Sequence, residues 1–226
     1  MKSLFIIFSC FLFLLFQDEY VGVRNQMVEV QIKARGVSDQ SVLSAMNKVP
    51  RHLFIPVDYQ SSAYADRPLP IGMGQTISQP YIVGYMTEAI HPQDDDVVLE
   101  IGTGSGYQAA VLAEIVKEVY TLEIIPELGL MAKERLRILG YENIHAKVSD
   151  GYHGWVEHGP FDAIVVTAAA EEIPQPLIDQ LAEGGRMIIP VGAKFDIQNL
   201  MLVTKKNGEV KTKKLFAVRF VPFTRD

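Results

Sequence analysis

A glycine-rich turn at residues 100–106, with the sequence Glu-Ile-Gly-Thr-Gly-Ser-Gly, is the segment of this chain best suited to bind a ligand. It follows a short β-branched run at residues 97–101 and precedes a segment with helical spacing. Glycines at such a strand-to-helix turn let the backbone approach a ligand closely and leave the amides of the helix N-terminus free to bind it. For this motif alone, a tight turn without a ligand remains the alternative. The candidate binding residues of the turn are Glu100, Gly102, Gly104 and Gly106.

The spacing within this turn argues against a dinucleotide. A G-x-G-x-x-G/A motif needs a small residue at its sixth position for close helix–strand packing, whereas Tyr107 stands there. The acid Glu100 lies two residues before the first glycine, and it suits a cationic or amine-bearing ligand better than a pyrophosphate. A nicotinamide-dependent enzyme is therefore the weaker interpretation.

Further acids follow the next two predicted strands. Glu123 lies at the end of residues 119–124, where a carboxylate can accept hydrogen bonds from both hydroxyls of a ribose. Asp150 and Gly151 follow residues 144–148, and an Asp there can accept from the exocyclic amine of adenine. Taken singly, each acid is equally consistent with a solvated strand end or turn. Because the carboxyl ends of adjacent parallel strands form one edge, together they predict a nucleoside site.

Several other classes of function lack their motifs. The five histidines show no metal-ligand spacing, and the single cysteine, Cys10, can form neither an internal disulfide nor a zinc site. We therefore expect no metal. Neither a G-x-S-x-G elbow nor a phosphate-binding P-loop is present. The net charge of -6, from 21 basic and 27 acidic residues, argues against binding to a nucleic-acid backbone.

Strand and helix patterns alternate from residue 97 onward, which predicts a doubly wound, mostly parallel α/β sheet. The expected strands are 97–101, 119–124, 144–148, 162–167 and 186–191, and the expected helices are 107–117, 128–139 and 176–181. The dipeptide Asn207-Gly208 then predicts a terminal antiparallel hairpin, with strands at 200–204 and 210–220.

The N-terminal part of the chain reads differently. Helical spacing at residues 27–34 and 41–49 predicts a helical lobe, which ends in a Gly/Pro/Ser-rich loop at residues 68–80. A loop of this length is more often functional than not. Ahead of the lobe, residues 4–16 form an uncharged apolar run that is too short for a stable bilayer span of roughly 20 residues. It fits a secretory signal peptide, a mis-assigned start codon or an uncleaved extension.

The glycine-rich turn, Glu123 and the Asp150-Gly151 pair resemble those of the S-adenosylmethionine-dependent methyltransferases of the Rossmann-like class. Further segments are similar to the protein-L-isoaspartate O-methyltransferases, and the likeness extends over about residues 23–224. The most specific of them is Gln75 to Pro80. The similar segments are residues 49–56, 69–72, 74–80, 161–169 and 218–222.

The resemblance implies methyl transfer from S-adenosylmethionine to the free α-carboxylate of L-isoaspartyl residues. The methyl ester then closes to a succinimide that hydrolyses partly to normal aspartate, so the activity repairs damaged proteins and peptides. By resemblance, Ser78 is the active-site serine, and Gln75, Thr76 and Ile77 lie in the loop over the cofactor. A carboxylate with a pKa of about 4 is already ionised at neutral pH, so no general base is needed.

The hydrophobic leader is the main departure from the family's pattern, and the remaining expectations combine the residues with the resemblance. We expect a leader at 1–17 and one methyltransferase domain at 18–226, divided into a lobe with the active-site loop (18–90) and a cofactor-binding sheet (91–226). Damaged proteins and peptides are the expected partners, with membrane contact only through the leader and a monomer favoured. A cytoplasmic location is expected, with export or tethering as the alternative. A methyltransferase with another substrate and a non-catalytic nucleoside-binding module also remain open.

Overall fold

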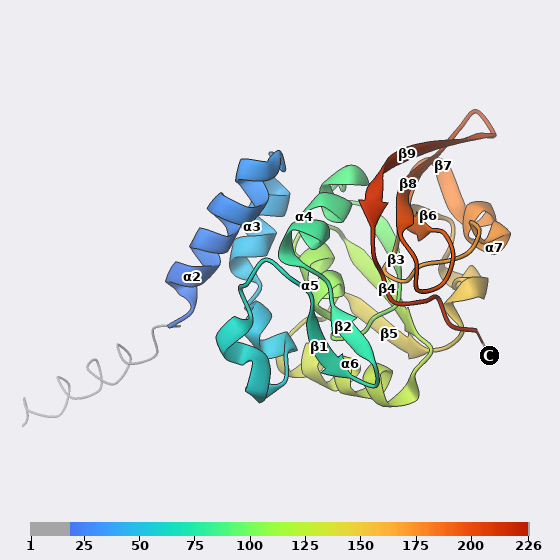
Figure 1. Ribbon diagram of the computed structural model, residues 1–226. Helices are drawn as coiled ribbons and strands as arrows, with labels where there is room; N and C mark the ends of the chain where they lie inside the picture. Colours follow the sequence, from blue (N-terminus) through green and yellow to red (C-terminus); the bar gives the residue numbers. More distant parts are fainter. Residues whose placement is uncertain (1–18, 226) are drawn as a thin grey trace, which may run out of the picture.

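A central sheet of seven strands organises the computed structural model, which describes residues 19–225 (Figure 1). The leader predicted at residues 1–17 lies outside the described residues. The strand order is β5-β4-β3-β6-β7-β8-β9, in which the first five are parallel and the last two antiparallel. This arrangement confirms the predicted fold class. The strands are β3 (Val97–Ile101), β4 (Glu118–Glu123), β5 (Ile144–Val148), β6 (Phe161–Val166), β7 (Leu181–Val191), β8 (Gln198–Lys206) and β9 (Glu209–Val218).

Helices cover both faces of this sheet because successive strand side chains point to opposite sides. In β6, Ala163 and Val165 join the apolar cluster under α4 and α5, while Ile164 and Val166 join the cluster under α7. The sheet is thus buried on both faces, as a parallel sheet requires. These helices and the one after β4 are α4 (Pro80–Ala89), α5 (Tyr107–Ala113), α6 (Pro126–Ile138) and α7 (Gln175–Asp179).

Two of the predicted helices differ from the observed ones at their ends. The helix expected at 107–117 ends at Ala113, whose carbonyl accepts a hydrogen bond from the side-chain amide of Asn143 at 3.0 Å. The helix expected at 176–181 ends at Asp179. Gly184 and Gly185 do not close that helix but lie inside β7. The pairing register of β6 and β7 shifts between residues 161 and 163, and the φ angle of +85° at Gly184 accompanies this irregularity.

The N-terminal lobe packs beside α4 and α5, as the blue helices of Figure 1 show. Its helices are α2 (Val21–Gln26), the π-helical η2 (Met27–Ile32), the 3-10 turn η3 (Lys33–Arg35) and α3 (Gln40–Lys48), followed by the 3-10 turns η4 (Arg51–Phe54) and η5 (Val57–Ser62). Asp39 caps α3 by accepting from the backbone amides of Ser41 and Val42. Met27, Met46 and Tyr107 are fully buried together, so the lobe and the sheet domain share one core.

The segment predicted as a loop at residues 68–80 is partly a hairpin, which corrects that expectation. Strands β1 (Leu69–Gly72) and β2 (Gln75–Ile77) pair antiparallel with Leu69 opposite Ile77, and both of these side chains are buried. Its tight turn has positive φ angles at residues 72–74, which Gly72 and Gly74 adopt at little cost, whereas the φ of +50° at Met73 is unusual for a residue with a side chain. The glycines and prolines of this segment predict a loop from the sequence alone, whereas the strand pairing depends on burial against the lobe.

Within residues 19–225, none of the helices combines the length and apolar character that crossing a bilayer would require.

Candidate active site

The glycine-rich turn joins β3 to α5 at the carboxyl edge of the sheet. Gly102, Gly104 and Gly106 have φ angles of +95°, +51° and +86°, which other residues rarely adopt. A Cβ atom on Gly102 would lie 2.5 Å from the Thr167 Oγ1, and that hydroxyl lies 2.7 Å from the Gly102 carbonyl oxygen, to which it donates. Thr167 follows β6 and was not among the predicted site residues, although it lies in a segment that resembles the family.

Glu100 is completely buried beside this turn. Its Oε2 accepts from the Thr121 hydroxyl at 2.5 Å, while its Oε1 has no hydrogen-bond partner among the described residues. Burial raises the pKa of Glu100 from its ordinary value of 4.5 to about 8. An unpartnered buried carboxyl oxygen is costly unless a ligand satisfies it, and a cation placed beside Glu100 would favour its ionised form. The site therefore fits a ligand that brings an ammonium group, such as the amino-acid end of S-adenosylmethionine.

Glu123 lies at the end of β4 and braces the same turn. Its Oε2 accepts from the backbone amide of Gly104 at 2.8 Å, and its Oε1 accepts from the amide of Ile125 at 3.0 Å. Glu123 also lines a cavity together with Gly102, Gly104 and Gly151, as the sequence led us to expect. Each carboxylate oxygen has a second lone pair. Acceptance from ribose hydroxyls is thus compatible with the bracing contacts.

Asp150 does not line that cavity, although its neighbour Gly151 does. The Asp150 Oδ1 accepts from the Tyr152 amide at 2.9 Å, and its Oδ2 pairs with Nε of Arg225 at 2.9 Å. Partial burial would raise the pKa of Asp150, but these two partners hold it below its ordinary value. The predicted contact between Asp150 and adenine stays a prediction. The C-terminal residues 221–224 line the cavity instead, which sequence reasoning did not anticipate.

The loop that contains Ser78 lies between two spaces. Gln75 and Thr76 line the cavity of the glycine-rich turn, and Thr76 also lines a neighbouring groove of about 520 Å³. Ile77 and Ser78 line a small cavity that also contains Glu100. Ser78 lines the groove as well, so its half-buried side chain lies where the turn and the groove meet. The structure thus brings together the residues that the sequence placed far apart.

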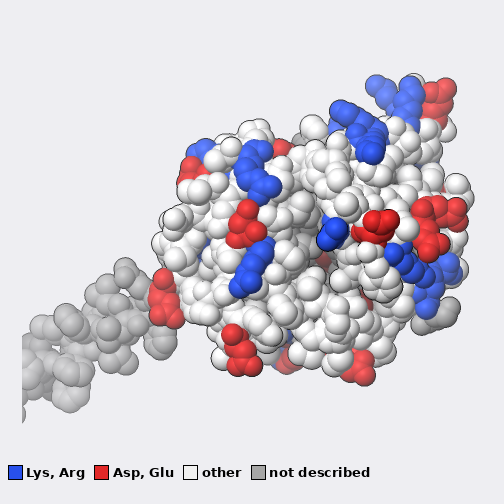
Figure 2. Space-filling view, in the orientation of Figure 1, with Lys and Arg blue, Asp and Glu red and all other residues white. Residues whose placement is uncertain are grey.

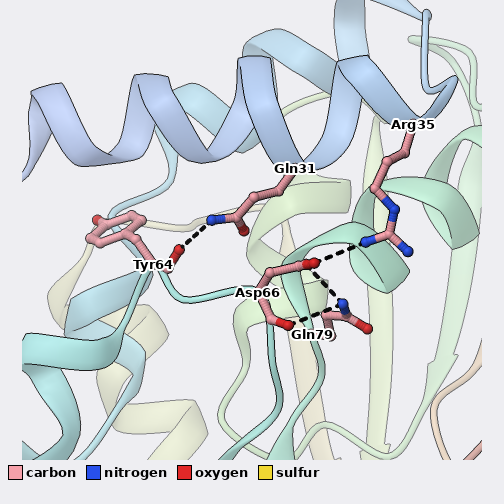
Figure 3. Close-up of polar contacts among 5 residues, drawn as sticks. All are labelled: Gln31, Arg35, Tyr64, Asp66 and Gln79. Atoms are coloured by element: carbon pink, nitrogen blue, oxygen red, sulfur yellow. Dashed lines mark hydrogen bonds and ion pairs between the residues drawn. The ribbon is translucent and has the colours of Figure 1, made fainter.

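A polar network ties this loop to the N-terminal lobe (Figure 3). The Gln79 amide donates to Oδ1 of Asp66 at 2.8 Å, and Nη1 of Arg35 pairs with Oδ2 of Asp66 at 3.0 Å. Nearby, the Gln31 amide donates to the Tyr64 carbonyl at 2.8 Å. Asp66 therefore holds the Gln79 side chain next to Ser78, and Arg35 of η3 in turn holds Asp66. Across residues 19–225, no His, Cys, Asp and Glu side chains gather in a group that could hold a metal.

The family model described as Protein-L-isoaspartate(D-aspartate) O-methyltransferase matches residues 23–226. A relative from Picosynechococcus sp. called protein-L-isoaspartate O-methyltransferase is 57% identical over 205 residues, which are 91% of this chain and 91% of the relative. A relative of the same name from Gloeobacter violaceus is 58% identical over 200 residues, which are 88% of this chain and 98% of the relative. A solved structure of the same description has a TM-score of 0.81 at 32% identity and covers 88% of this chain, which spans 65% of that longer chain.

A Plasmodium falciparum structure described as a protein-L-isoaspartate O-methyltransferase in complex with S-adenosyl-L-homocysteine has a TM-score of 0.75 at 29% identity, and it covers 90% of this chain and 99% of its own. The fold, the glycine-rich turn and the buried Glu100 define an S-adenosylmethionine-dependent methyltransferase of the Rossmann-like class. Within this class, the chain belongs to the protein-L-isoaspartate O-methyltransferase family.

We expect Glu100→Gln to separate folding stability from cofactor binding. Between pH 4.5 and about 8 the folded wild type keeps a proton that the unfolded chain has released, so its stability falls as pH rises through this range. Gln stays neutral and lacks this loss. Urea unfolding should show that the free energy of unfolding of the variant rises relative to that of the wild type between pH 5 and pH 9. Calorimetry should show weaker binding of S-adenosylhomocysteine to the variant. A constant stability difference, with the exposed Glu171→Gln as control, would contradict the assigned pKa.

We expect Glu123→Ala to weaken cofactor binding about tenfold or more, because charge-assisted hydrogen bonds contribute roughly 1.5–3 kcal/mol each. Glu123 also braces the turn, so the direct effect is isolated with 2′-deoxy-S-adenosylhomocysteine. Calorimetry should show that removing the hydroxyl weakens binding to the wild type but not to the variant. An equal loss in both proteins would leave Glu123 with a bracing role only.

Proposed function

We propose that this protein transfers a methyl group from S-adenosylmethionine to the free α-carboxylate of L-isoaspartyl residues in damaged proteins and peptides. The ester then closes to a succinimide, which begins repair. Family membership supports the activity. The observation that carries the assignment of the site is the position of Ser78, which lines both the groove and the small cavity that contains Glu100.

The cofactor residues divide the ligand among them. The carboxylate of Glu100 binds the ammonium group, Glu123 binds the ribose, and the Asp150–Gly151 turn lies at the adenine end. Gly102 and Gly104 keep the backbone clear of side chains where it lines the cavity, and Gly106 leaves room for the Leu136 side chain. When bound, the cofactor supplies a sulfonium methyl that is already activated. Gln75, Thr76 and Ile77 cover the cavity and exclude water from it.

The groove suits an anionic acceptor. Two charged residues among the described ones line it, Arg35 and Arg219; Arg35 is already paired with Asp66, so Arg219 supplies the charge that no carboxylate in the described part of the chain neutralises. The acceptor carboxylate has a pKa of about 4 and needs no proton removed at neutral pH. The Ser78 hydroxyl donates a hydrogen bond to this carboxylate and orients the attacking oxygen toward the methyl carbon. It does not act as a nucleophile, because no general base is paired with it among the described residues.

The proposal also covers the domain organisation, the location and the oligomeric state. We place residues 18–226 in one domain, with 18–90 as lobe and acceptor loop and 91–226 as the cofactor-binding sheet. A cytoplasmic location and a monomeric state are proposed from the family. On the face shown in Figure 2, basic side chains gather at the top right, at the tip of the β8–β9 hairpin, and elsewhere they are interspersed with acids. This face presents no continuous basic stripe of the kind that tracks nucleic acid.

We expect labelled methyl transfer from S-adenosylmethionine to an isoaspartyl peptide and none to its normal aspartyl twin. The label should leave the peptide in mild base, because methyl esters hydrolyse readily. Equal labelling of both peptides would contradict the substrate assignment and favour a methyltransferase of the same fold with another substrate. Cofactor binding without labelling of either peptide would favour a non-catalytic nucleoside-binding module.

We expect Ser78→Ala to lower methyl transfer about 10- to 100-fold and to leave cofactor affinity within a few-fold, because one orienting bond is lost. Single-turnover kinetics and calorimetry measure the two quantities, with the exposed Ser61→Ala as the matched control. Turnover at the wild-type rate in the variant would show that Ser78 has only a structural role in the loop. A methylated or peptidyl Ser78 found by mass spectrometry would instead contradict direct transfer.

A further inference from the structure

Arg51, the first residue of η4, is a completely buried arginine. No carboxylate pairs with it among residues 19–225. Burial lowers the pKa of Arg51 to about 10, so the guanidinium still carries its charge at neutral pH. Burial of a charge without a counter-ion is costly and is rare unless other contacts compensate for it.

The contacts of Arg51 converge on the active site. Its Nε donates to the carbonyl of Ala63 at 2.7 Å, and its Nη2 donates to the carbonyl of Ser78 at 2.7 Å. The guanidinium carbon lies 4.9 Å from the centre of the Tyr107 ring, in cation–π geometry. Its Nη1 has no hydrogen-bond partner among the described residues. One planar group therefore contacts the lobe, the acceptor loop and α5.

Two of these contacts connect the halves of the reaction. Ser78 belongs to the loop that orients the acceptor, whereas Tyr107 follows directly after the glycine-rich turn that holds the cofactor. Direct transfer needs the carboxylate oxygen, the methyl carbon and the sulfur in line, and a misplacement of about 1 Å can cost about 100-fold in rate. A rigid, charged, bidentate side chain between the two parts can set this alignment.

The network around Asp66 in Figure 3 restrains the neighbouring residue in a weaker way. It acts on the Gln79 side chain, and the Arg35–Asp66 pair is about 40% exposed, with 42% and 38% for the two side chains. Exposed ion pairs contribute little. The bond from Arg51, by contrast, is made to the main chain of Ser78 itself and from a buried donor.

We propose that Arg51 is a positioning residue for methyl transfer, which holds the Ser78 carbonyl and sets the distance between the acceptor loop and the glycine-rich turn. The proposal rests on the proposed function of Ser78. It goes further because it assigns alignment of the two substrates to a side chain outside both cavities. Lysine cannot replace this arginine, since an ammonium on a flexible chain cannot donate in two fixed directions.

Arg51→Ala and Arg51→Lys test the proposal, with the exposed Arg137→Lys as control. Circular dichroism and thermal unfolding establish that each variant is folded. We expect S-adenosylhomocysteine affinity within about threefold of wild type in both, and kcat for the isoaspartyl peptide about 100-fold lower with a smaller change in KM. Methylguanidinium added to Arg51→Ala should raise kcat at least tenfold, because it refills the space that the side chain leaves.

The remaining outcomes overturn the proposal. Wild-type kcat in a folded Arg51→Ala would show that no alignment depends on it. Parallel losses of cofactor affinity and kcat without rescue, or variants that stay unfolded even with methylguanidinium, would make Arg51 a structural residue only. Failure of the proposed function is seen separately, because the wild type itself would then not label the isoaspartyl peptide.

Discussion

The structure depends on the glycine-rich turn at the carboxyl edge of the sheet, where a backbone with few side chains joins β3 to α5. The left-handed conformation of Gly102 and Gly104 makes this possible. Two side chains from neighbouring strands keep the turn in place, since Thr167 donates to the Gly102 carbonyl and Glu123 accepts from the Gly104 amide. With its polar groups satisfied from both sides, the turn is preorganised rather than formed around the ligand.

The site has two parts that favour ligands of opposite charge. Glu100 is buried with one oxygen unpartnered, and burial raises its pKa. A cationic ligand beside Glu100 would therefore stabilise the folded protein. The groove on the other side of Ser78 has arginines as its charged lining residues and suits an anion. Under the proposed function, a cofactor with an ammonium group and an acceptor with a carboxylate meet at one loop. This is the charge pattern expected for methylation of a carboxylate without a base.

The N-terminal lobe is the structural support of that loop. The lobe shares a core with α5 through Met27, Met46 and Tyr107, and it reaches the loop through Arg51 and Asp66. Loops with these compositions are usually mobile. Here β1 and β2 pair and bury Leu69 and Ile77, so Ser78 directly follows a short, restrained segment. The lobe therefore restrains the loop that contains Ser78 through direct contacts.

The sequence by itself determined the sheet and its ligand edge, because both depend on local signals. Alternating β-branched runs, the glycines after β3, Glu123 after β4 and the Asn207-Gly208 turn are readable within a few residues. The roles of Thr167, residues 221–224 and Arg51 were decided only by tertiary structure. Each of them lies far along the chain from its partner: the hydroxyl of Thr167 meets Gly102 across 65 residues, and Arg51 meets Ser78 across 27. Local propensity carries no information about such contacts, since pairing of β3 with β6 brings Thr167 to Gly102, and packing of the lobe against the loop brings Arg51 to Ser78.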